Sequence, residues 1–190
     1  DGNTGVGTGV LGALTTGDNN VAVGLNALDV NTTGFDNTAV GKDSLKANTT
    51  SRDNLALGMC ALNANTTGSR NTASGTLALD SNTTACDNTA TGYKALYANT
   101  TGANNVALGR SALESSTTAI RNTAVGNYSL YDNTTGQDNV AVGTYALESN
   151  TTASNNTAVG YFSLYANTTG ASNTSLGKSS LGANTTGASN

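Results

Sequence analysis

The chain has 190 residues, of which 36% are hydrophobic and 11% charged, and it contains no Pro, Trp or His. Its net charge is -4 and its basic residues are scattered, which disfavours binding to nucleic-acid phosphates. No apolar stretch approaches the roughly 18 residues of a membrane span, so we expect no membrane insertion. Asn, Thr, Gly, Ala and Ser recur at fixed positions, unlike in a disordered chain, which would be rich in Pro, Glu, Lys and Gln.

The sequence repeats itself every 17 residues without an insertion, with the consensus N-T-A-V-G-x-x-A-L-x-x-N-T-T-G-x-x. We number these repeat positions 1 to 17. Eleven units fill one array over residues 1–190, and they begin at Asn3, Asn20, Asn37, Asn54, Asn71, Asn88, Asn105, Asn122, Asn139, Asn156 and Asn173. Both ends of the sequence fall within the motif, which favours an excerpt of a longer fibre over a filament whose units continue from chain to chain.

Seventeen residues are too few for a pair of helices, and Gly, Asn, Thr and Ser are poor helix formers. Two short strands and two turns do fit. The first strand is expected over N-T-A-V-G and the second from A-L to T-T, with Gly at positions 5 and 15 in the turns. We therefore predict an all-β fold, a parallel β-solenoid (β-roll) of eleven coils, with one two-strand coil per repeat and a rise of about 4.8 Å per coil.

Stacked coils turn each repeated residue into a column. The Leu at position 9 is the largest invariant apolar residue and predicts the core, while Ala at position 3 suits a narrow interior. Positions 2 and 4 then face outward by strand alternation and form a largely apolar stripe that predicts an interface between chains. The residues representing this stripe are Val21, Val23, Leu55, Leu57, Val106 and Leu108. The Asn at position 1 predicts a ladder of side-chain amides.

The N-T-A-V-G segment, as in residues 20–24 and 105–109, resembles the head repeat of YadA-like trimeric autotransporter adhesins, which carry a similar S-V-A-I-G strand. The resemblance implies a left-handed β-roll, a homotrimer packed through the apolar strand positions, and adhesion to a host surface or matrix. The period of 17 and the N-T-T-G segment depart from that family and are also similar to arrays in phage tail fibres and bacterial surface proteins.

The residues that usually carry chemistry are sparse. Without His there is no imidazole base and no usual zinc site. Cys60 and Cys86 occupy different repeat positions, which leaves their pairing and the redox compartment open. The acids at position 17 are interpreted as solvated turn residues rather than catalytic pairs; they include Asp36, Asp53, Asp87 and Asp138. We expect no enzyme, no metal and no cofactor.

Three exposed features suggest ligands. The Thr pairs at positions 13 and 14 suggest an ice-binding column, although adjacent strand residues should face opposite ways. The N-x-T pattern marks candidate glycosylation sites at Asn31, Asn48, Asn65, Asn82, Asn99, Asn133, Asn150, Asn167 and Asn184, with turn capping as the preferred alternative. Aromatic residues at positions 6, 7 and 10 are candidate glycan contacts: Tyr93, Tyr97, Tyr128, Tyr131, Tyr145, Tyr161, Phe162 and Tyr165.

The sequence as a whole predicts a structural role. We expect an extracellular rod, on a cell surface or a virion, that forms part of a surface adhesin or phage tail fibre and presents a binding tip. The expected partners are copies of the same chain, as a homotrimer or filament, and surface glycans or host matrix. An adhesin that binds carbohydrate through its Tyr-rich edge is the main alternative, and an ice-binding solenoid is a minor one.

Overall fold

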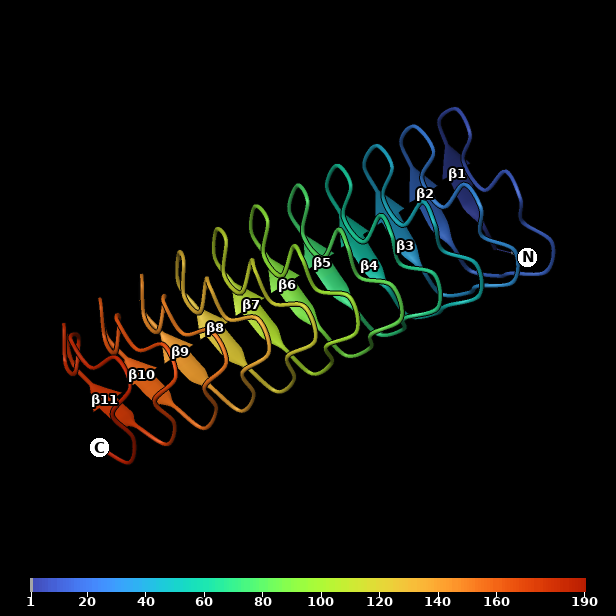
Figure 1. Ribbon diagram of the computed structural model, residues 1–190. Coiled ribbons are helices and arrows are strands. Elements are labelled where there is room, and N and C mark those ends of the chain that lie inside the picture. Colours follow the sequence, from blue (N-terminus) through green and yellow to red (C-terminus); the bar gives the residue numbers. More distant parts are fainter. Residues whose placement is uncertain (1) are drawn as a thin grey trace.

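The chain folds as a parallel β-solenoid, in a computed structural model that describes residues 2–190. The strands stand side by side in chain order along a rod, with the two ends of the chain at its two ends (Figure 1). They are β1 Thr4–Val6, β2 Val21–Val23, β3 Thr38–Val40, β4 Leu55–Leu57, β5 Thr72–Ser74, β6 Thr89–Thr91, β7 Val106–Leu108, β8 Thr123–Val125, β9 Val140–Val142, β10 Thr157–Val159 and β11 Thr174–Leu176. The predicted all-β solenoid is confirmed.

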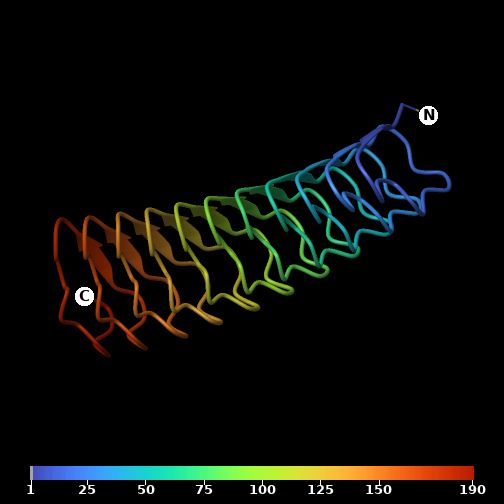
Figure 2. The same ribbon diagram turned by 90° about the horizontal axis from the view of Figure 1, so that it is seen from above.

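All strands belong to one 11-stranded parallel sheet in which each strand pairs with the next unit without a shift. Thr4 lies opposite Val21, for example, and Val21 opposite Thr38. Viewed from above, the sheet forms one wall of the rod, and the rest of each coil forms the opposite wall (Figure 2). None of residues 2–190 forms a helix, so this part of the chain holds no helix that could cross a membrane.

The predicted second strand does not form, because the backbone is left-handed directly before it, at position 7, and again within it, at position 9. The residues at positions 7 and 9 have positive φ in every coil, and those at position 9 are all Leu, with φ between 47° and 54°. A left-handed non-Gly residue costs roughly 1–2 kcal/mol and interrupts a strand. Main-chain bonds between coils nevertheless continue on this side, as from Leu28 N to Ser44 O at 3.1 Å and from Thr32 N to Thr49 O at 2.9 Å.

The core is the predicted one. Leu at position 9 is 0% exposed in the nine inner coils, and Ala at position 3 is 0% exposed from Ala22 to Ala158. Burial of each Leu contributes about 1.5–3 kcal/mol, which offsets the cost of its positive φ. Glycine at position 5 is required by close stacking as well as by φ: a Cβ on Gly24 would lie 2.7 Å from the carbonyl oxygen of Gly41.

Candidate functional site

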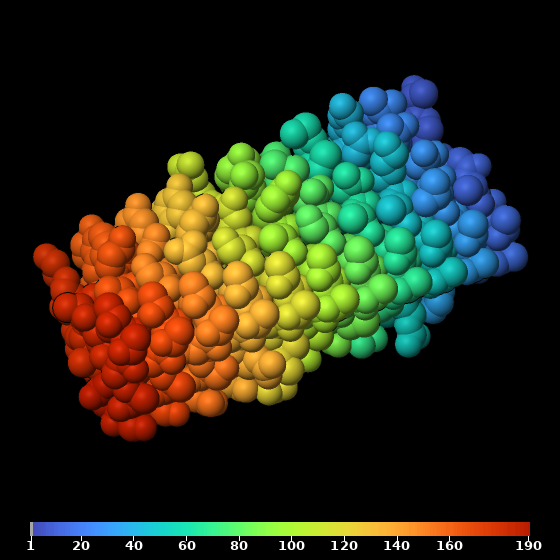
Figure 3. Space-filling model, viewed as in Figure 1, coloured from blue at the N-terminus to red at the C-terminus, as the bar shows by residue number. Residues whose placement is uncertain are grey.

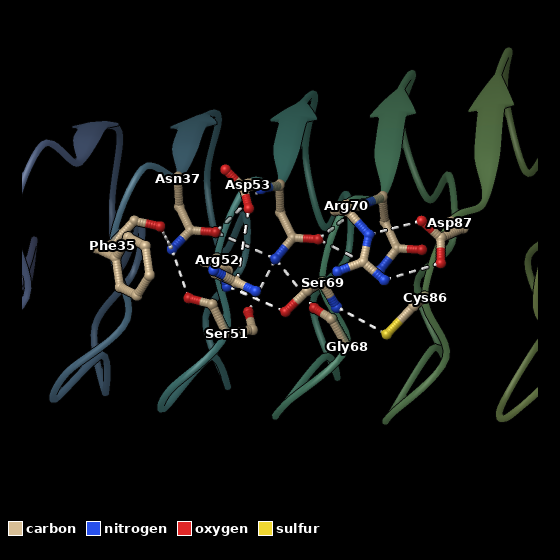
Figure 4. A network of polar contacts seen from close by, with 12 residues as sticks. Phe35, Asn37, Ser51, Arg52, Asp53, Gly68, Ser69, Arg70, Cys86 and Asp87 are labelled. Atoms are coloured by element: carbon tan, nitrogen blue, oxygen red, sulfur yellow. Dashed lines mark hydrogen bonds and ion pairs between the residues drawn. The ribbon is translucent and has the colours of Figure 1, made fainter.

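Two ladders of buried asparagine amides hold successive coils together. In the first, at position 1, each Oδ1 accepts from the main-chain N–H of the asparagine one coil further on, without interruption from Asn3 to Asn190. Figure 4 shows part of this ladder around Asn37. The predicted amide ladder is thus confirmed.

The second ladder lies at position 12, where the sequence suggested glycosylation. Asn48 Nδ2 donates to Asn31 Oδ1 at 2.9 Å, and Asn31 Nδ2 donates to the carbonyl oxygen of Gly34 at 3.0 Å. That carbonyl also accepts from Asn20 Nδ2 at 2.9 Å, so the two ladders converge on position 15.

Burial of this second ladder argues against the glycosylation candidates. Asn31, Asn48, Asn65, Asn82, Asn99, Asn133, Asn150 and Asn167 are 0% exposed, and Asn184 in the last coil is only partly exposed. A glycan attaches at Nδ2, and in a folded coil this atom is inside and donates hydrogen bonds. The alternative prediction, that these asparagines support a turn, fits the bonds to position 15.

The second ladder is interrupted once, at Ser116. Asn99 Oδ1 and Ser116 Oγ are both buried without a hydrogen-bond partner, because a serine hydroxyl takes the place of the amide that would bridge them. Bridging resumes with Asn150 Nδ2, which donates to Asn133 Oδ1 at 2.9 Å. The first coil also departs from the pattern, with Leu14 at this position.

The paired threonines have different environments. At position 13 the hydroxyl donates to the Thr carbonyl of the next coil, in ten coils from Thr15 to Thr168. At position 14 every Thr is exposed, and its hydroxyl has no partner within residues 2–190. The expectation that the two side chains face opposite ways rested on a strand that the structure does not contain.

The aromatic candidates all come together on one edge of the rod. Tyr128, Tyr145 and Phe162 stack at position 7, with ring centroids 5.3 and 4.9 Å apart. Tyr131 meets the stack edge-on at 5.5 Å. Two further rings, Tyr161 and Tyr165, lie 4.4 and 4.8 Å from Phe162, also edge-on.

Two cations extend this row, and sequence reasoning missed both. The Arg110 guanidinium lies 5.5 Å from the Tyr128 ring and 6.0 Å from that of Tyr93. Lys94 Nζ lies 5.8 Å from Tyr93 and 5.1 Å from Tyr97. All eight aromatic candidates thus belong to one surface, which we call the aromatic ridge. The signal in the sequence was the fixed period, which places positions 6, 7 and 10 of successive units side by side.

Ionisable side chains outside the aromatic ridge lie in turns, and several of them form ion pairs. Arg70 Nε lies 2.7 Å from Asp87, one coil further on (Figure 4). Arg121 Nε lies 2.6 Å from Asp138, also one coil further on. These guanidinium hydrogen bonds hold the pKa of both carboxyls below the ordinary value of 3.8. Asp36 and Asp53 also have positive φ, as turn residues do. The interpretation of position 17 as turn acids agrees with this geometry.

Both cysteines are free, and burial raises the pKa of the Cys60 thiol. Within residues 2–190 there is no pocket and no group of three Cys, Asp or Glu side chains placed to hold a metal ion.

The outward stripe lies where predicted. In β4 and β7 the central Ala is 0% exposed, whereas Leu57 and Leu108 are 36% and 37% exposed. Val21, Val23, Leu55 and Val106 are half-buried on the same face. We call this face, made by positions 2 and 4, the sheet face; it carries no charged residue in any of the eleven units.

The fold defines the class of protein, a parallel β-solenoid of 17-residue coils. No protein-family model, curated protein or solved structure matches the chain.

Proposed function

We propose that the chain is a rigid rod, a segment of an extracellular fibre in a surface adhesin or a phage tail fibre, that holds a binding tip away from a cell or virion. The observation that carries the proposal is the unbroken register of eleven strands, each paired residue by residue with the next unit. The similarity of the strand segment to adhesin head repeats supports the same function.

The contacts between coils explain why such a rod would be stiff. Buried leucines, the first amide ladder and main-chain bonds join every coil to its neighbours, and the second ladder adds to them except at Leu14 and Ser116. The space-filling view shows one elongated body (Figure 3). Because each coil adds about 4.8 Å, the length of the rod is set by the number of units.

This role can be tested by changing the number of units. Residues 71–87 form one complete unit, so their removal keeps the register, and duplication of the same unit lengthens the rod. With the rod placed between a surface anchor and a binding module, we expect the reach of the module to change by about 4.8 Å per unit. A reach that does not follow unit number would contradict the proposal.

We further propose that the sheet face packs against copies of the same chain, as a homotrimer. An uncharged face that exposes Val and Leu along the whole rod is typical of an association surface. Light scattering would give the mass of the wild type and of Leu57→Glu combined with Leu108→Glu. We expect a trimer for the wild type and a monomer for the double variant.

The matched control is Leu25→Glu, because Leu25 is also exposed, at 44%, but lies at position 6 outside the sheet face. It should leave the trimer intact. A monomeric wild type would overturn the interface, and long filaments would favour association through the ends of the rod.

Ice binding is the second candidate, because position 14 is Thr in all eleven units although every one of these side chains is exposed and its hydroxyl unpartnered. Neighbouring exposed positions vary freely, so the fold alone does not explain this column. A rigid line of identical hydroxyl and methyl groups, about 4.8 Å apart, suits a surface with its own repeat. Ice crystals that grow with facets in the presence of the wild type, but not in that of the Thr67→Lys, Thr101→Lys variant, would support ice binding. Ice growth that the wild type does not change would exclude it.

A further inference from the structure

The rings of the aromatic ridge mostly cover one another. Tyr145 lies between Tyr128 and Phe162, with interplanar angles of 5° and 16°. On its other side Tyr128 has the Arg110 guanidinium, 5.5 Å from its centroid. Both faces of these two tyrosines are therefore occupied, and only their edges reach solvent.

The last coil of the ridge is different. Its three rings, Tyr161, Phe162 and Tyr165, are followed one coil further on by Lys178, Ser179 and Gly182 at the same repeat positions. The backbones are adjacent, since Ser179 N donates to Tyr161 O at 2.8 Å and Ala166 N donates to Gly182 O at 3.2 Å. Serine and glycine are too small to cover a ring, so neither Ser179 nor Gly182 covers the far side of Phe162 or the neighbouring Tyr165.

We propose that these three rings, which we call the aromatic shelf, bind one pyranose ring of a glycan, with acidic sugars preferred. One face of a pyranose presents C–H groups, which pack on an open aromatic face as other apolar groups do. The Tyr161, Tyr165 and Ser179 hydroxyls around the floor can donate to and accept from sugar hydroxyls. This site is independent of the rod function.

The preference for acidic sugars comes from Lys178. Lys178 occupies the repeat position of Tyr161 one coil further on, which places its ammonium group beside the shelf. A positive charge at this place attracts a sugar carboxylate. An open shelf that contacts a single sugar ring should bind weakly, with a Kd on the order of 1 mM.

The experiment is a titration of the full chain with oligogalacturonate, an acidic probe, and with maltohexaose and chitohexaose as neutral probes, monitored by NMR. We expect binding of oligogalacturonate that weakens about tenfold or more in Phe162→Ser and in Tyr161→Thr. Both substitutions use residues that other units carry at the same positions, Ser111 and Thr144. Lys178→Gln should reduce binding of the acidic probe to that of a neutral one.

Two further variants separate a shelf from a general aromatic effect. Tyr93 occupies the same repeat position as Tyr161 and is similarly exposed, at 45% against 48%. Tyr93→Thr should therefore leave binding within twofold of that of the wild type. Ser179→Leu keeps all three rings but covers Phe162, as Leu77 at this position shows to be compatible with the fold, and it should abolish binding.

The proposal is overturned if none of the three probes binds at millimolar concentration, or if binding survives Phe162→Ser or Ser179→Leu. An equal loss in Tyr93→Thr and Tyr161→Thr would also overturn it, because it would spread binding along the ridge. Unchanged circular dichroism of each variant shows that the fold is retained.

Discussion

The two asparagine ladders use the same side chain in different ways. At position 1, Oδ1 accepts from a main-chain N–H as well as from a side-chain amide. Asn105 Oδ1, for example, accepts from the main-chain N of Asn122 at 3.0 Å and from its Nδ2 at 3.2 Å. At position 12, Oδ1 accepts from a side-chain amide, as Asn82 does from Asn99 at 2.9 Å. The first ladder therefore provides a hydrogen-bond acceptor for main-chain N–H groups that have no other partner. The second ladder mainly joins side-chain amides to one another.

This difference explains where the repeat tolerates substitution. Position 1 is Asn in every unit, whereas position 12 is Leu14 in the first unit and Ser116 in the seventh. A buried main-chain N–H without an acceptor costs about 1–3 kcal/mol, and no substitution other than proline removes it. A missing side-chain amide leaves fewer groups unpaired. The comparison teaches that, of the two asparagine columns, the invariant one is the one that bonds the main chain.

The largest expected effect is that of Asn105→Ala compared with Asn82→Ala. Asn105→Ala leaves the main-chain N–H of Asn122 and the carbonyl of Ala119 without a bond, and should lower the free energy of unfolding by about 3–5 kcal/mol. Asn82→Ala leaves the side-chain oxygen Oδ1 of Asn65 without a donor, but Ala85 O still accepts from Asn71 Nδ2, so it should cost only about 2–3 kcal/mol. Urea unfolding followed by circular dichroism measures both.

Gln137→Ala is the control, because this half-buried residue carries a side-chain amide at position 16 outside both ladders, and that amide forms no hydrogen bond within residues 2–190. It should change the free energy of unfolding by less than about 0.5 kcal/mol. Equal costs for Asn105→Ala and Asn82→Ala would show that the main-chain bond does not distinguish the ladders.

Asn99→Ala sharpens the comparison within the second ladder. The Oδ1 of Asn99 is already unpaired, so its removal eliminates one orphaned acceptor while breaking the bonds of Nδ2 to Asn82 and Gly102. We expect a cost of about 1–2 kcal/mol, below that of Asn82→Ala. If both alanine variants unfold at the same urea concentration, the orphaned oxygen has no energetic consequence.

Ser116→Asn should repair the break and stabilise the rod by about 1 kcal/mol. Its new amide would donate to Asn99 Oδ1 and to Ala119 O, as Asn82 does to Asn65 and to Ala85 O. Ser115→Asn, on the half-exposed neighbour, is the matched control and should have no effect. Destabilisation by Ser116→Asn would mean that the coil at this position has adapted to the smaller side chain.

The solenoid, its core, the first ladder and the outward stripe could all be predicted, because each depends on which residue types recur at a fixed period. The missing second strand could not be read from Leu alone, since Leu is rarely left-handed. A signal for it did exist: positions 7, 9 and 17 never contain Val, Ile or Thr, although positions 2 and 4 often do. β-Branched residues are the least tolerant of positive φ, so their absence marks these columns.

The fixed period predicts where the aromatic side chains lie, whereas hydrogen bonding decides where the N-x-T asparagines lie. Because the eight aromatic residues occupy only three repeat positions, stacking of the coils places them on one edge. Their mutual stacking, which covers most ring faces, depends on side-chain orientation that the spacing does not give. The N-x-T pattern suggested a surface site, but the asparagine faces inward because its amide can bridge coils and close a turn at once.

The smallest expected effect concerns pH, because amide ladders carry no titrating proton. The pKa of Asp138 is held below 3.8 by the hydrogen bond from Arg121, so this pair stabilises the fold above about pH 4 and loses that contribution as pH falls through the lowered pKa. Burial raises the pKa of Asp80, so protonation there acts in the opposite direction. With no His in the chain, the urea midpoint should stay constant from pH 5 to 7 and fall slightly below pH 4.

Asp138→Asn separates the ion pair from the ladders in this experiment. It should lower the urea midpoint slightly at pH 7, and its difference from the wild type should disappear as pH falls through the lowered pKa of the wild-type carboxyl. Asp36→Asn, at the same repeat position, is the matched control and should be neutral at pH 7. A steep loss of stability between pH 5 and 7 would instead mean that charged groups, and not the amide ladders, hold the coils together.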